Sequence, residues 1–323
     1  MRRFLAASLA SLILLAALAA GVLLWADGEF KKPGPSLEDQ VVVLPRGAGL
    51  DSIAQRLDRA GVIENSWLFR FGVRLSGAAR GLQAGEFLFT AGLSAEGVMN
   101  HLLTGRPVAR RITVPEGMTS RAVVELINDA IGLEGFIAAL PEEGAMLPET
   151  YQYAFGDFRA EMVERMTAAM AETLAALWSG RRAGLPYETP NDALTLASIV
   201  ERETGRAAER RHVAGVFVNR LRRGMRLQSD PTVIYGLTGG EGALERPLSR
   251  ADLKHDSPYN TYRIKGLPPG PIANPGRSSI VAALDPLVTE DLYFVADGSG
   301  GHVFARSLAA HNRNVAKWRK LQK

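Results

Sequence analysis

The hydrophobic and polar positions divide the 323-residue chain into an apolar leader, a short polar stretch and a long remainder with helical and strand-like patterns. The leader, residues 4–26, carries no charged side chain. A helix of that length can cross a hydrocarbon core of about 30 Å. Residues 27–39 are polar and contain the run KKPGP, which predicts a linker.

The flanks of the leader predict its orientation. Arg2 and Arg3 precede it, so the positive-inside rule places residues 1–3 in the cytoplasm and the bulk of the chain outside the inner (plasma) membrane. The alternative is a cleaved signal peptide, because residues 17–19 offer an A-x-A site. The apolar run continues past that site, beyond the usual length of about 7–15 residues, so we expect an uncleaved single-pass anchor.

Residues 40–105 predict a small α+β unit, in which apolar residues recur with strand and helix periods. Expected strands are Val41–Pro45 and Glu86–Phe89, and expected helices are Asp51–Arg59, Ser66–Leu75 and Ser94–Leu103.

Residues 108–323 predict a larger, mainly helical unit with β-hairpins. We expect a strand at Arg110–Val114, helices at 119–131, 161–178, 208–223 and 307–320, a helix capped by Asn191 that ends at Glu203, and a hairpin at 292–305 that turns at Asp297-Gly298. Thr119 or Ser120 is the expected N-cap of the first helix. The fold class is therefore α+β with an N-terminal transmembrane helix.

Composition excludes several kinds of chemistry. With no cysteine, the chain has no disulfide, no thiolate nucleophile and no cysteine-ligated zinc. Its five histidines are scattered and no H-E-x-x-H motif is present, so we expect no metal site and no cofactor. A net charge of +4 indicates attraction to an anionic envelope polymer or membrane surface. Nucleic acid is not an expected partner, because the bulk of the chain lies outside the cytoplasm and basic and aromatic residues are not interleaved.

The segment LASIVERETG, residues 196–205, carries two candidate acids at the end of an apolar helical pattern. Helical spacing places Glu203 on the apolar face and Glu201 on a smaller, more mixed face. A carboxyl buried on such a face has a raised pKa and can serve as a general acid. The alternative from spacing alone is an ordinary surface glutamate at a helix end.

Two later segments are rich in hydrogen-bonding and aromatic residues. MRLQSDPTVIYGL, residues 225–237, places several polar side chains beside a turn and an expected strand at Thr232–Tyr235. YNTYRIKGLPPGPIANPG, residues 259–276, predicts a long loop with Tyr and Asn at its start. Such mixtures suit sugar recognition. An Asx-turn and a plain connector are the alternatives.

Taken together, the motifs GLPPG, LQSDPTVIYG, YNTY, YFVADGSGGHVF and EEGAMLPETY resemble the endolytic murein transglycosylase, or YceG-like, family. The resemblance covers nearly the whole chain beyond the linker and implies a catalytic domain at residues 108–323. Residues 40–105, through the segment Gly47–Ile63, resemble the family's LysM-like subdomain, which in this chain lacks an obvious aromatic platform for sugar.

This resemblance implies a lytic cut between N-acetylmuramic acid and N-acetylglucosamine in peptidoglycan glycan strands, leaving 1,6-anhydromuramic ends. It places the catalytic glutamate in the ERET segment; we assign Glu203, which precedes Thr204, with Glu201 as the fallback. The residues expected to position sugar or orient the acid are Gln228, Asp230, Thr232, Tyr235, Tyr259 and Asn260.

The anchor restricts the expected activity to glycan near the membrane. We therefore expect nascent strands to be cut and their length limited, with peptidoglycan synthases as candidate partners. Two other functions are compatible with the sequence: a non-catalytic peptidoglycan-binding scaffold of the synthesis machinery, and a glycoside hydrolase with Asp230 as its second carboxylate.

Overall fold

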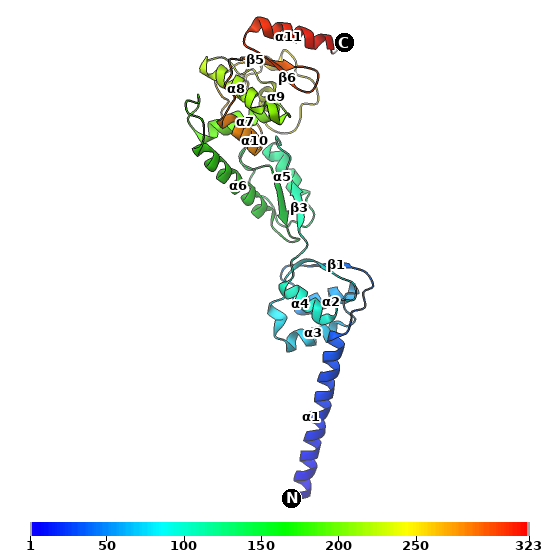
Figure 1. The fold of residues 1–323 in the computed structure, drawn as a ribbon. Helices are drawn as coiled ribbons and strands as arrows, with labels where there is room; N and C mark the ends of the chain where they lie inside the picture. Colours follow the sequence, from blue (N-terminus) through cyan, green and yellow to red (C-terminus); the bar gives the residue numbers. More distant parts are fainter. Residues whose placement is uncertain (1, 322–323) are drawn as a thin grey trace. The chain divides into compact units, whose positions relative to one another are not determined.

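The computed structural model describes the backbone of residues 2–321 and the side chains of residues 9–320. The chain forms two compact units, Met1–Arg110 with Gln152–Asp157 and Arg111–Tyr151 with Phe158–Lys323. Each unit has its own hydrophobic core. The described residues are mainly helical and include three two-stranded sheets, so the fold is a mixture of α and β with an N-terminal apolar helix (Figure 1).

The N-terminal unit packs three short helices around one pair of strands. Its elements are α1 (Arg2–Lys31), β1 (Gln40–Leu44), α2 (Leu50–Arg59), α3 (Ser66–Leu75), the 3-10 helix η1 (Ala78–Arg80), β2 (Gly85–Phe89) and α4 (Ala95–Thr104). Strands β1 and β2 are antiparallel, with Val42 opposite Phe87. The helices lie within about one residue of their expected positions, because amphipathic spacing buries one face of each.

Helix α1 is longer than the apolar run that predicted it. It continues to Lys31, five residues into the stretch expected to be a linker. Ala26 and Phe30 are buried on α3, and a Lys31–Asp27 ion pair of 2.9 Å spans the last turn. Hydrophobic burial and this i,i+4 pair account for the extra helical turns. Residues Leu9–Lys31 are long and apolar enough to cross a membrane, a property that signal sequences share.

The C-terminal unit is built on three packed helices, α7 (Pro190–Glu203), α8 (Arg210–Arg222) and α10 (Arg277–Leu284). Apolar residues from all three form its core. The other elements of the chain are β3 (Arg110–Thr113), α5 (Ser120–Asn128), β4 (Thr150–Tyr153), α6 (Arg159–Ser179), η2 (Ala207–Glu209), α9 (Asp230–Thr238), η3 (Asp252–Lys254), β5 (Tyr293–Ala296), β6 (His302–Ala305) and α11 (Leu308–Leu321). The ends of β3 and β4 belong to the N-terminal unit. Strands β5 and β6 form the expected antiparallel hairpin.

Three expectations about this unit need correction. Thr232–Tyr235 was expected as a strand but lies inside helix α9, which has Pro231 in its first turn and the left-handed Gly239 as its C-cap. A short apolar run does not distinguish strand from helix, and here the helix-compatible termini decide. The cap of α7 is Thr189 rather than Asn191, because Thr189 and Asp192 form a reciprocal capping box. Helix α10 was not predicted, since it lies at the end of the proline-rich loop.

Candidate active site

Glu203 is the last residue of α7, where the helix leaves the core. Leu196, Ile199 and Val200 are buried, as the spacing predicted, and they direct the end of this face inward. The Ser229 hydroxyl donates a 2.5 Å hydrogen bond to Glu203 Oε1. Burial raises the pKa of Glu203 to about 7 from an ordinary value of 4.5, and the negative charge of Asp230 acts in the same direction.

Glu201, two residues earlier, is held very differently. Its side chain is 4% exposed and accepts bonds from Arg210 Nη2 at 2.8 Å and from the Gly276 backbone N–H at 2.9 Å. Arg210 also reaches Glu116 at 2.8 Å. Glu201 is therefore an ion-paired carboxylate that joins α7 to α8 and to the start of α10, and it does not line the cleft beside Glu203.

A polar cleft of about 370 Å³ opens beside Glu203. It is lined by Glu203, Arg220, Leu227, Gln228, Asp230, Tyr262, Tyr293, Phe294, Leu308 and His311. These side chains come from α7, α8, the loop before α9, the proline-rich loop, β5 and α11. The cleft therefore combines two carboxyl groups, Glu203 and Asp230, with a guanidinium, further polar groups and aromatic rings, a mixture that suits sugar recognition.

Arg220 is the cation of the cleft. It lies on the buried side of α8, and its guanidinium donates to the carbonyl oxygens of Leu292 at 2.7 Å and Leu227 at 2.6 Å. Burial lowers the pKa of Arg220 from its usual value. Because the hydrogen bonds go to neutral carbonyls, no carboxylate cancels its charge directly, and that charge opposes the rise in the Glu203 pKa.

Two of the six residues expected to contact sugar line this cleft. Gln228 is exposed and lies in the left-handed region at φ 53°, which only Gln228 among the described non-glycine residues does. Backbone strain of this kind is often found at binding sites. Asp230 begins α9 and accepts a 2.6 Å hydrogen bond from the Tyr262 hydroxyl, which fixes its orientation in the cleft.

Thr232 and Asn260 are instead in the packed interior. The Thr232 hydroxyl contacts the Ser229 carbonyl at 2.7 Å and Thr261 Oγ1 at 2.8 Å. Asn260 donates to the carbonyl oxygens of Leu253 and His255. Both residues hold the loops that carry Ser229 and Tyr262, so the structure gives them contacts with protein and not with the cleft.

Tyr235 and Tyr259 lie outside the set of residues that lines the cleft. Their rings pack against each other with centroids 4.8 Å apart. Tyr235 also bonds to Glu143, whose Oε1 accepts from the Ser120 backbone N–H at 2.8 Å. Burial raises the pKa of Glu143. The two tyrosines thus form a separate aromatic and acidic cluster.

Four polar residues of the cleft were not among those expected to contact sugar, namely Arg220, Tyr262, Tyr293 and His311. Tyr262 belongs to the YNTY segment that the sequence singled out. One signal was available for Arg220, since it follows Val213, Val216 and Phe217 on the buried face of the helix pattern at 208–223. A cation on such a face needs buried partners. Tyr293 and His311 come from distant elements, and their spacing carries no sign of the cleft.

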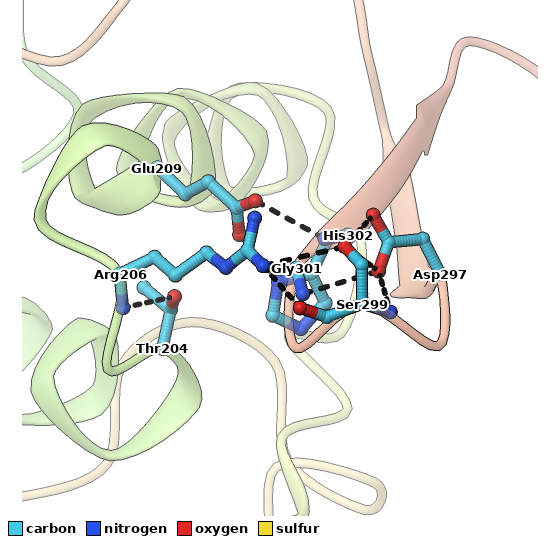
Figure 2. Close-up of polar contacts among 7 residues, drawn as sticks. All are labelled: Thr204, Arg206, Glu209, Asp297, Ser299, Gly301 and His302. Carbon is cyan, nitrogen blue, oxygen red and sulfur yellow. Dashed lines mark hydrogen bonds and ion pairs between the residues drawn. The ribbon is translucent and has the colours of Figure 1, made fainter.

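A network of polar contacts ties the loop after Glu203 to the β5–β6 hairpin (Figure 2). The Arg206 guanidinium donates to the Ser299 carbonyl, and the Arg206 backbone N–H donates to Thr204 Oγ1 at 3.1 Å. His302 Nδ1 lies 2.7 Å from Glu209 Oε2. A Cβ at Gly301 would come within 2.5 Å of Glu209 Oε1, so a larger residue here would displace the Glu209 side chain.

The side chain of Asp297 stabilises the turn of this hairpin by hydrogen bonds to backbone groups of the turn. Asp297 Oδ1 accepts from the backbone N–H groups of Ser299 at 2.7 Å and Gly301 at 3.1 Å. The His302 ring also packs edge-on against Phe294, which lines the cleft. The positive charge of His302, when present, lowers the Glu203 pKa. We call Arg206, Glu209, Asp297, Ser299, Gly301 and His302 the hairpin clasp.

No group of three or more histidine, aspartate or glutamate side chains able to hold a metal ion is found among the residues that the structure describes.

Comparisons with known proteins agree in pointing to one family. The model of the YceG-like family matches residues 42–317. A protein named endolytic murein transglycosylase from Bacillus subtilis is 32% identical over 310 residues, covering 85% of this chain and 83% of that protein. A protein of the same name from Streptococcus pneumoniae is 28% identical over 324 residues, with 85% of this chain and 58% of that protein covered.

A solved structure has the same architecture. The 2.6 Å crystal structure of a yceG-like protein from Listeria monocytogenes superposes with a TM-score of 0.53 at 28% sequence identity. The match covers 86% of this chain and 99% of that one. The chain therefore belongs to the YceG-like family.

Proposed function

We propose that this chain is a membrane-anchored lytic transglycosylase that cuts peptidoglycan glycan strands, with Glu203 as its single acid and base. The observation that supports this most directly is a half-buried glutamate at the edge of a polar cleft, whose pKa is raised to about 7 by desolvation of its carboxyl group. Similarity to proteins named endolytic murein transglycosylases supplies the substrate class.

In the first step, the Glu203 proton passes to the oxygen between N-acetylmuramic acid and N-acetylglucosamine, and the bond from that oxygen to muramic C1 breaks. In the second step, the Glu203 carboxylate takes the proton of the muramic 6-hydroxyl as its oxygen bonds to C1. The product is a 1,6-anhydromuramic end, and no water is consumed. A pKa near neutrality suits a carboxyl that must donate and then accept a proton.

The neighbouring side chains have distinct proposed roles. Ser229 orients Glu203 through its 2.5 Å hydrogen bond. Gln228 and Asp230 contact sugar, while Thr232 and Asn260 act as positioning residues behind them. Tyr235 and Tyr259 take no part in proton transfer. Their proposed role is to bind a longer glycan strand. If so, replacing either by alanine weakens the binding of long strands more than the binding of short ones.

The full chain in detergent, incubated with purified glycan strands and followed by mass spectrometry of the products, tests the function. We expect anhydro ends that disappear with Glu203→Gln and persist with Glu201→Gln. Loss in Glu201→Gln but not Glu203→Gln, in folded proteins, would move the assignment to Glu201. Binding without any cleavage by the unsubstituted chain would contradict an enzyme and favour a scaffold.

A two-carboxylate glycoside hydrolase is the second candidate, because Asp230 lines the same cleft as Glu203. Hydrolases place two carboxyl groups across the scissile bond and use water. That reaction leaves reducing ends, and Asp230→Asn would abolish it. The lytic reaction instead leaves anhydro ends, whose formation continues in Asp230→Asn at a reduced rate.

Helix α1 supports a proposal about the location of the enzyme. We propose that α1 remains uncleaved, with its N-terminus in the cytoplasm and the catalytic unit outside the membrane. Cleavage then falls on nascent strands close to the membrane, beside the peptidoglycan synthases, and limits strand length. Glycan strands from cells that lack the protein are expected to be longer; an unchanged length distribution would contradict this role.

A further inference from the structure

One face of α3 is apolar and partly exposed. Trp67 and Leu75 are 56% and 69% exposed, and the Trp67 ring stacks on Phe71 with centroids 5.6 Å apart. These three residues recur every four positions and so form one stripe along the helix. Phe69 and Val73, on another face of the same helix, are fully buried in the core of the unit. We call Trp67, Phe71 and Leu75 the α3 stripe.

The α3 stripe lies beside the end of α1. Phe30 of α1 packs on Phe69 with ring centroids 6.3 Å apart. Gly72 makes this packing possible, because a Cβ at that position would come within 2.6 Å of the Phe30 ring. The two helices are therefore fixed against each other by a close, apolar contact inside the N-terminal unit.

Two cavities on this side of the unit are lined by both helices. One, of about 230 Å³, is lined by Leu23 and Ala26 of α1 and by Phe71 and Leu75 of α3. The other, of about 220 Å³, has Trp25 of α1 and Trp67 of α3 among its lining residues. The α3 stripe thus shares these cavities with Leu23 and Trp25, which belong to the apolar run of residues 4–26.

That position sets the depth of the stripe. The charged part of α1 begins at Asp27, and a helix rises about 1.5 Å per residue, so Leu23 lies roughly 6 Å inside the apolar run. If the run fills the hydrocarbon layer, side chains that share a cavity with Leu23 lie at the membrane boundary. Tryptophan is enriched at that boundary, where an amphipathic ring meets both lipid and water.

The charges around the stripe indicate which lipid property matters. Lys31 pairs with Asp27 at 2.9 Å and Lys32 with Glu29 at 3.5 Å. On α3 itself, Arg70 pairs with Asp51 at 2.8 Å and Arg74 approaches the same carboxylate at 3.5 Å. Glu64 and Glu96 also line the two cavities. This surface has no excess of basic charge, so it suits the apolar boundary of a bilayer and does not depend on anionic headgroups.

We propose that the α3 stripe inserts into the interfacial layer of the membrane that α1 crosses, so that the N-terminal unit rests on the lipid surface. This inference relies on the proposed membrane anchor and adds a second, lateral contact to it. A unit that rests on lipid cannot swing freely on a tether. The height of the N-terminal unit above the membrane is then set by two helices.

The test uses the full chain in nanodiscs that hold one copy, with nitroxide-labelled lipids as quenchers of tryptophan fluorescence. The chain has four tryptophans, and Trp25→Phe, Trp178→Phe and Trp318→Phe leave only Trp67. In a background that also carries Trp67→Phe, Leu14→Trp reports on the anchor. Leu88→Trp reports on a residue of β2 that is 44% exposed in the same unit and lines neither of the two cavities.

We expect Trp67 to lose fluorescence to lipids labelled near the headgroup, as Leu14→Trp does to lipids labelled deeper, while Leu88→Trp keeps its intensity. The loss for Trp67 is expected to be the same in zwitterionic and anionic discs. Quenching of Leu14→Trp without quenching of Trp67 would overturn the α3 proposal and leave the anchor intact. Failure of Leu14→Trp to be quenched would instead refute the anchor and this proposal with it.

Two further outcomes also discriminate. If Trp67 is quenched only in anionic discs, the apolar basis of the contact is wrong. If aqueous iodide quenches Trp67 in discs with one chain but not in discs with two, a second copy covers the stripe and the lipid proposal is overturned.

Discussion

The pH dependence of cleavage follows directly from the environment of Glu203. A general acid must hold its proton in the free enzyme, so kcat/KM is expected to follow the protonated fraction of Glu203. Burial raises its pKa to about 7. We therefore expect kcat/KM to be level at acidic pH and to fall about tenfold per pH unit above 7. With an ordinary carboxyl pKa, only about one molecule in 300 would be protonated at neutral pH.

The falling part of the kcat/KM profile at high pH is its basic limb. Two neighbours of Glu203 should shift this limb along the pH axis in opposite directions. The Ser229 hydroxyl donates to the carboxylate and favours its charged form, so Ser229→Ala is expected to shift the limb to higher pH. Asp230 repels the charged form, so Asp230→Asn is expected to shift the limb to lower pH. Each shift is measured within one variant, so a general loss of activity does not disturb it.

The assay is the initial rate of anhydro-end formation from soluble glycan oligosaccharides at constant ionic strength, quantified by mass spectrometry. Glu201→Gln is the matched control, because Glu201 is ion-paired outside the cleft and its loss should leave the limb in place. A limb in the range of ordinary carboxyl groups, or shifts of the same sign in the Ser229 and Asp230 variants, would refute the proposed acid.

Other substitutions test the remaining features of the site. Glu203→Gln should raise the melting temperature at about pH 8 and change it little at about pH 4. The reason is that the raised pKa of Glu203 in the folded state makes the folded protein less stable as pH rises from about 4.5 to about 7. Thermal denaturation at both pH values checks this. Arg210→Ala leaves Glu201 buried without its ion pair and should lower the free energy of unfolding by about 3–5 kcal/mol in a denaturant titration. Gln228→Gly removes a left-handed non-glycine residue and should add about 1 kcal/mol to that free energy while raising KM; an unchanged KM would remove Gln228 from the sugar contacts. Asp297→Ala removes the acceptor inside the hairpin turn and should speed amide exchange there and lower kcat while the melting temperature changes by only a few degrees.

The fold was predictable wherever hydrophobic spacing was long and regular. The helix at Ser66–Leu75 has the expected bounds, and the apolar face leading to Glu203 is buried as expected. Prediction failed where the apolar run was short. Thr232–Tyr235 has β-branched and aromatic residues typical of a strand, yet Pro231 and Gly239 start and end a helix around it. Local preference at such positions gives way to the termini that the chain provides.

The cleft was predictable only in part, because its walls come from elements far apart in the chain. Gln228 and Asp230 belong to one short segment at the start of α9, and the polar character of that segment was visible in the sequence. Tyr293 and His311 reach the cleft from β5 and α11, whose packing is a tertiary property. Thr232 and Asn260 have the same polar chemistry as sugar-binding residues but satisfy their hydrogen bonds within the protein. Residue type alone cannot distinguish these two uses.

The end of α7 holds two glutamates in different surroundings, and that difference supports the proposed mechanism with one carboxyl. Glu201 forms a 2.8 Å ion pair with Arg210. Glu203 is subject to opposing influences: burial and Asp230 raise its pKa, while Ser229, His302 and Arg220 lower it. Burial alone would keep the proton bound and leave a poor base for the second step, whereas close cations alone would leave no proton for the first. A balance near neutrality makes both forms accessible to one side chain, so the substrate's own hydroxyl can replace the second carboxylate of an ordinary glycosidase.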